Sequence, residues 1–87
     1  MLTTTLIADA EAIARERRPR VIIGALGALN RELDALPDRA ALAARGIIRE
    51  AQAAALDIYS QTAASPAACY TRILRSMNRV AGILRRI

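Results

Sequence analysis

Two pairs of carboxylates are the residues in this sequence best spaced for acid–base chemistry. Asp9 and Glu16 lie seven residues apart, and so do Glu50 and Asp57. On an α-helix this separation puts both members of a pair on one face, where one could donate a proton while the other accepts it. Such pairs are far more often solvated neighbours on a helix surface than a catalytic dyad, and we interpret them in this way.

The side chains that usually complete an active site are missing. The 87 residues contain no His and no Lys, and Cys69 is the one cysteine. The common general base and the Schiff-base nucleophile are therefore absent. Metal binding by carboxylates alone would need several acids close together, and none converge in the sequence. We expect no enzyme activity, no cofactor and no bound metal.

Charge distribution is the feature that bears most directly on function. Residues 1–57 carry eight Arg and eight acidic residues, whereas residues 58–87 carry five Arg and no acidic residue. The net charge of +5 therefore lies in the last thirty residues. An unbalanced basic helix face can bind acidic proteins, anionic lipid or nucleic acid, although it can also be a solvated face. The candidate partner-binding residues, which share one side of the last predicted helix, are Arg72, Arg75, Arg79 and Arg86.

Proline residues divide the chain into helical segments, at Pro19, Pro37 and Pro66. Ala, Leu, Arg and Ile dominate, and no stretch alternates with a period of two for long enough to be a strand. The sequence therefore predicts an all-α fold in a single domain over residues 1–87. The expected helices span residues 4–17, 20–36, 39–63 and 66–86.

Local signals mark some of the predicted helix ends and contacts. Asp38 is the expected N-cap of the third helix and Ser65 that of the fourth, where Pro66 suits the first helical position. Gly24 and Gly27 interrupt the second segment and allow either close approach of another helix or a merely looser helix. The four arginines around Pro19 are interpreted as an ordinary solvated helix junction.

Apolar seams with alternating spacings of four and three residues run along the last three segments, which we expect to form the core. The third seam is mostly alanine, and the only aromatic residues are Tyr59 and Tyr70. So small a core buries limited surface, and we therefore expect a homodimer that completes a joint helical bundle of three to four helices per chain. The expected core and dimer residues are Leu26, Leu29, Leu33, Ile48, Ala51, Ala55, Ile58, Tyr70, Ile73, Met77, Val80 and Leu84.

Our functional hypothesis is a small non-catalytic regulator or adaptor that binds an acidic protein partner through the basic last helix. One alternative is a nucleic-acid-associated helical protein whose same arginines contact phosphates. Another is a structural assembly subunit with no charged partner. The longest strongly apolar run, 21–29, is too short for a bilayer, which needs about 20 residues, and no secretory signal is apparent. We therefore expect no integral membrane span and a cytoplasmic location.

Overall fold

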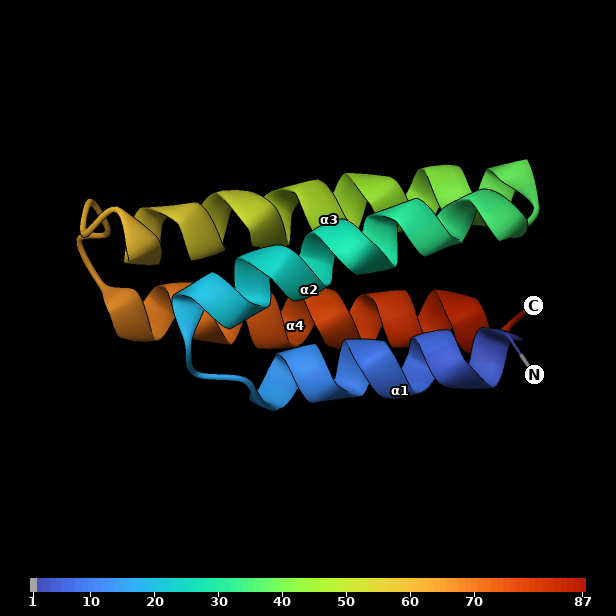
Figure 1. Ribbon diagram of the computed structural model, residues 1–87, viewed down its shortest axis with the longest axis horizontal. Coiled ribbons are helices and arrows are strands. Elements are labelled where there is room, and N and C mark those ends of the chain that lie inside the picture. Colours follow the sequence, from blue (N-terminus) through green and yellow to red (C-terminus); the bar gives the residue numbers. More distant parts are fainter. Residues whose placement is uncertain (1) are drawn as a thin grey trace.

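The computed structural model describes residues 2–87 and contains a bundle of four α-helices. It measures 36 × 19 × 18 Å and its helices lie side by side along the long axis (Figure 1). The all-α prediction is confirmed, and the described residues include no strand. A short 3₁₀ turn over Leu33–Ala35 follows the second helix. The four helices are α1 (Leu2–Arg15), α2 (Pro19–Glu32), α3 (Asp38–Tyr59) and α4 (Pro66–Arg85).

The helices occupy the corners of a four-sided arrangement. Helix α4 packs against α1 and α3, and α2 packs against the same two helices, whereas no Cα atoms of the diagonal pairs within residues 2–87 come within 8 Å of each other. The α1–α2 side is therefore opposite the α3–α4 side (Figure 1). The contact between α1 and α2 is the least extensive of the four.

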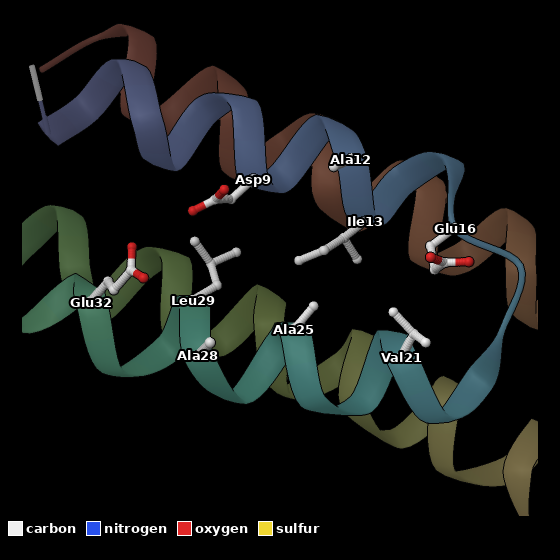
Figure 2. A pocket seen from close by; sticks show the side chains of 9 residues that line it. All are labelled: Asp9, Ala12, Ile13, Glu16, Val21, Ala25, Ala28, Leu29 and Glu32. Carbon is white, nitrogen blue, oxygen red and sulfur yellow. The ribbon is translucent and has the colours of Figure 1, made fainter.

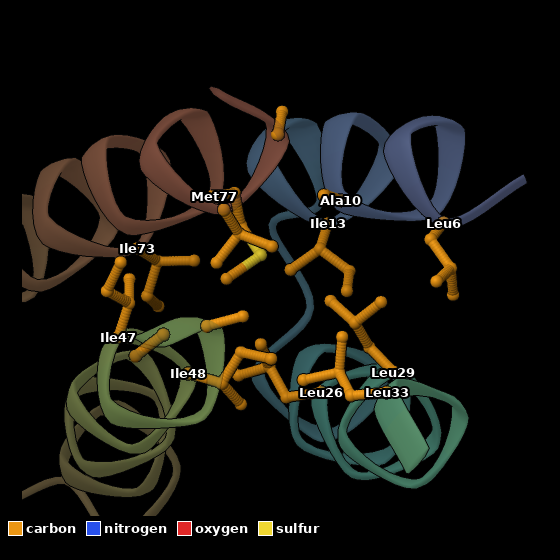
Figure 3. Close-up of a cluster of buried hydrophobic side chains, with 14 of the residues drawn as sticks. Leu6, Ala10, Ile13, Leu26, Leu29, Leu33, Ile47, Ile48, Ile73 and Met77 are labelled. Atoms are coloured by element: carbon orange, nitrogen blue, oxygen red, sulfur yellow. The ribbon is translucent and has the colours of Figure 1, made fainter. Parts of the chain in front are cut away.

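One apolar core fills the centre of the bundle and draws side chains from all four helices (Figure 3). Ten of the twelve predicted core residues are buried, while Ile58 and Tyr70 are partly buried at its edge. The expectation that α1 stands outside the core is wrong, because Leu6 and Ala10 are fully buried. The alanine seam of α3 is covered within one chain, so the core is closed without a partner. Homodimerisation stays a prediction.

The end of α3 differs from the predicted boundary at residue 63. The helix ends at Tyr59, and Gln61 adopts a φ of 60°. The amide of Gln61 then donates to the carbonyl of Ile58 at 3.1 Å, and that of Thr62 to the carbonyl of Asp57 at 2.9 Å. This pair of bonds is a Schellman motif, which satisfies the last carbonyls of a helix and stops it.

Other helix ends partly follow the sequence signals. Ser65 caps α4 as predicted, since its Oγ accepts a hydrogen bond from the Ala68 amide at 3.2 Å. Asp38 is not the cap of α3, because Pro37 holds that position and Asp38 is the first helical residue. Its carboxylate still lies in the first turn, where the helix dipole favours a negative charge. The predicted second helix over 20–36 is shorter, since regular α-helix stops at Glu32.

Candidate functional site

The predicted arginines share one exposed face of α4, beside α3. Two adjoining hollows, of about 600 and 420 Å³, lie along the line where these helices meet, and Arg79 borders both. The first also contacts Arg72 and Arg75, and the second contacts Arg86. We call this feature, defined by Arg72, Arg75, Arg79 and Arg86, the arginine groove.

Helical geometry explains why these side chains gather. Ile73, Met77 and Val80 are buried on the inner face of α4, so residues offset by about half a turn from them point outwards. The arginines follow one another at spacings of three, four and seven residues, which keeps them on one side of the helix. Two small residues also line the groove: Ala68, about one turn before Arg72, and Gly82, between Arg79 and Arg86.

A single carboxylate lines the arginine groove. Glu50 of α3 approaches Arg79, with 3.8 Å between its Oε2 and the arginine Nη1. Both side chains are more than 60% exposed, so water screens this pair and its contribution to stability is small. Arg72, Arg75 and Arg86 make no ion pair within residues 2–87. The groove therefore keeps an excess of positive charge.

Arg85 has a different role from its neighbours. Its Nη2 donates to Glu11 Oε2 of α1 at 2.9 Å, which joins the last helix to the first. This arginine therefore belongs to the α1–α4 side of the bundle and not to the arginine groove. An unpaired guanidinium, by contrast, offers a planar fork of donors that matches a carboxylate or a phosphate.

The carboxylate pairs considered for acid–base chemistry lie in dissimilar surroundings. The Glu50 carboxylate faces Arg79 across the arginine groove, whereas the Asp57 carboxylate accepts a hydrogen bond from the Thr62 hydroxyl at 3.4 Å, at the end of α3. Glu16 accepts hydrogen bonds from the amide of Arg17 at 2.9 Å and from the side chain of Arg18 at 2.8 Å. The hydrogen bonds from the Arg18 side chain, and then from the Arg18 and Arg17 amides, lower the pKa of Glu16 from 4.5 to about 2. No group of three or more potential metal ligands occurs among the described residues.

A second groove lies between α1 and α2 and was missed by the sequence analysis. It has a volume of about 350 Å³, and three carboxylates line it together with an apolar floor (Figure 2). We call it the acidic groove, defined by Asp9, Glu16 and Glu32. The signal was present in the sequence, because residues 21, 25, 28 and 32 of its α2 wall follow spacings of four, three and four. The groove became visible only once α1 was placed beside α2.

Comparisons with family models, with curated proteins and with solved structures gave no match for this chain. Within residues 2–87, no helix has the length and apolar character needed to cross a bilayer. The two grooves and the side chains that line them are therefore the features of the chain that bear on its function.

Proposed function

We propose that this chain is a non-catalytic regulator or adaptor that binds an acidic protein surface through the arginine groove. The observation that carries the proposal is the alignment of four exposed arginines beside one carboxylate along the α3–α4 side. Three of these arginines have no ion pair within the described residues. Their side chains are therefore available to carboxylates of a partner.

The spacing of the arginines favours a helical acidic partner. Arg72, Arg79 and Arg86 follow one another at seven-residue intervals, which correspond to about 10.5 Å along a helix axis. Carboxylates at every seventh position of a partner helix have the same spacing. Binding of single-stranded nucleic acid usually adds aromatic rings on which bases stack, and no aromatic residue lines the groove. Nucleic acid is therefore the second candidate partner, and the experiment must distinguish it from an acidic protein.

Two further expectations belong to this proposal. Self-association would produce an oligomer that presents more than one copy of the binding surface, which suits an adaptor. A cytoplasmic location is expected from the sequence, and the absence of a membrane-spanning helix in residues 2–87 is compatible with it. Neither expectation is needed for the arginine groove to bind a partner.

The test is a binding assay with a defined acidic probe. A fluorescently labelled helical peptide of Ala and Glu, with Glu at every seventh position, is titrated with the protein and its anisotropy recorded. The variant R72Q/R75Q/R79Q removes three charges from the groove. The matched variant R20Q/R31Q/R49Q removes three charges from exposed positions outside it. Circular dichroism of each preparation confirms that the helices remain folded.

We expect the groove variant to bind the peptide at least about tenfold more weakly, with the matched variant close to the parent chain. Equal weakening by both variants would mean that net charge alone governs binding and would overturn the proposal. A labelled DNA duplex is titrated in parallel. If it binds through the groove much more tightly than the acidic peptide does, the protein partner is replaced by nucleic acid.

A further inference from the structure

The acidic groove has a shape on which one more helix could pack. Its accessible floor consists of the exposed side chain of Val21 and the half-buried residues Ala25 and Ala28, and the core residues Ile13 and Leu29 close it from below (Figure 2). The alternating spacings of the α2 wall are those by which one helix packs along another. Small side chains let a helix backbone come close, and the limited contact between α1 and α2 leaves room above them.

The charges around this floor define what the additional helix must carry. Asp9 of α1 and Glu32 of α2 lie near one end of the acidic groove, and neither makes an ion pair within residues 2–87. Glu16 lies towards the other end and is paired with Arg18. No arginine lines the groove. A helix that presents guanidinium groups above apolar stems fits both the charge and the floor.

We infer that the helix seated in the acidic groove is α4 of a second copy of this chain. The inference rests on the proposed function, because it identifies the acidic partner of the arginine groove as the α1–α2 side of another copy. Arg72 and Arg79 are seven residues apart and span about 10.5 Å along α4. Asp9 and Glu16 are also seven residues apart, with Asp9 in α1 and Glu16 directly after its last residue. The long stems of the arginines cover the apolar floor while their heads reach the rim carboxylates.

The geometry of the bundle determines the kind of assembly. The α1–α2 and α3–α4 sides are opposite each other. Each copy therefore binds α4 of one neighbour in its acidic groove, while its own α4 binds the acidic groove of another. Such a contact is heterologous and joins copies head to tail. A pair of copies therefore leaves one acidic groove and one arginine groove free, and addition of further copies extends the assembly or closes it into a ring.

The experiment measures self-association of the whole chain by sedimentation equilibrium over a range of protein concentrations. D9N/E32Q removes the two unpaired carboxylates of the acidic groove. The matched variant D38N/D57N removes two exposed carboxylates outside it. We expect the first variant to self-associate at least about tenfold more weakly, while the second behaves as the parent chain does. Added salt should weaken association of the parent chain.

A charge swap gives the sharper test. D9R/E32R makes the acidic groove basic, and R72E/R75E/R79E makes the arginine groove acidic. Each variant alone presents like charges on both surfaces and should remain monomeric, whereas an equimolar mixture should associate because opposite charges again meet. Circular dichroism is recorded on both variants so that loss of association is not confused with unfolding.

Three results would overturn the inference: a monomeric parent chain at every concentration, undiminished association of D9N/E32Q, or no association in the swapped mixture. Binding of the acidic peptide distinguishes failure of the second-copy inference from failure of the proposed function. If the parent chain is monomeric but still binds the peptide through its arginines, only the second copy is excluded as the partner. If arginine replacement changes neither peptide binding nor association, both proposals fail.

Discussion

The hydroxyl of Tyr70 donates a hydrogen bond to the carbonyl oxygen of Arg17 at 2.7 Å, across 53 positions of sequence. The guanidinium of Arg17 also lies 5.1 Å from the centre of the Tyr70 ring, within the range of a cation–π contact. Tyr70 belongs to the first turns of α4, and Arg17 to the connection between α1 and α2. The two residues therefore fasten this connection to the last helix.

Replacement of Tyr70 by Phe tests the hydrogen bond while keeping the ring. We expect Y70F to lower the free energy of unfolding by about 0.5–1.5 kcal/mol, the usual net contribution of one hydrogen bond. Urea unfolding followed by circular dichroism measures the change. R17Q keeps the backbone carbonyl that accepts the hydrogen bond but loses the cation–π contact. Its effect on the free energy of unfolding therefore measures the cation–π contact separately. A Y70F variant as stable as the parent chain would mean that water replaces the lost contact.

Leu29 tests the core that the seams predict. It is 1% exposed, which confirms its predicted burial, and it also forms part of the floor of the acidic groove. L29A should lower the free energy of unfolding by about 2–5 kcal/mol, because it removes buried methyl groups and leaves a cavity. L42A deletes the same atoms from a side chain that is 75% exposed and should cost much less. Thermal and urea unfolding of the two variants provide the comparison, and equal losses would contradict the α2 register.

The helices could be predicted because their signals are local. Pro19 and Pro66 occupy first-turn positions, Ser65 supplies a cap, and the apolar spacings mark the buried faces. The stop of α3 at Tyr59 could not be read in this way, because Gln61 is not a residue typical of a left-handed turn. The place of α1 in the core could not be predicted for another reason. Its few apolar residues are buried only because α2 and α4 pack on either side of it.

In the candidate site, too, features within one helix could be predicted from the sequence, whereas features that depend on helix packing could not. The common side of Arg72, Arg75, Arg79 and Arg86 could be predicted from their spacing within one segment, whereas the groove beside them also depends on α3. The position of Glu50 opposite Arg79 depends on how α3 packs against α4, which no local pattern specifies. The acidic groove needs two helices in a fixed relation, as does the contact of Tyr70 with Arg17.

Gln61 provides a test of the α3 stop. Its φ of 60° lies in the left-handed region, where a side chain other than that of Gly is disfavoured. Q61G should therefore raise the free energy of unfolding by roughly 0.5–1 kcal/mol, whereas Q61V, with a branched Cβ, should lower it. Both changes are read from thermal unfolding midpoints. Stabilisation by valine would show that the Schellman motif is not populated in solution.

Gly24 should be replaceable by alanine with a gain in stability. It lies inside α2, and a Cβ atom added there meets nothing within 4 Å. Of the two alternatives for Gly24, close approach of another helix is therefore not seen within the described residues. Because alanine is favoured over glycine within a helix, G24A should stabilise the fold by roughly 0.5–1 kcal/mol. A destabilised G24A in urea unfolding, with loss of self-association, would instead indicate a partner packed on this face.

Glu16 links stability to pH through the connection that follows α1. Its carboxylate accepts hydrogen bonds from Arg18 and from the Arg17 amide, so the folded chain favours the ionised form. The side-chain hydrogen bond from Arg18 is the main reason that the pKa of Glu16 falls from 4.5 to about 2. A group whose pKa is lower in the folded than in the unfolded chain stabilises the fold when it is ionised in both states.

The contribution of Glu16 should therefore be complete above pH 4.5 and disappear as the pH falls from 4.5 towards 2. NMR titration of the Glu16 carboxyl carbon should give a midpoint near the lower value. R18Q removes the principal donor and should return the midpoint towards 4.5, and E16Q should remove this part of the pH dependence of urea unfolding. A midpoint near 4.5 in the parent chain would mean that the contact between Glu16 and Arg18 does not persist in water.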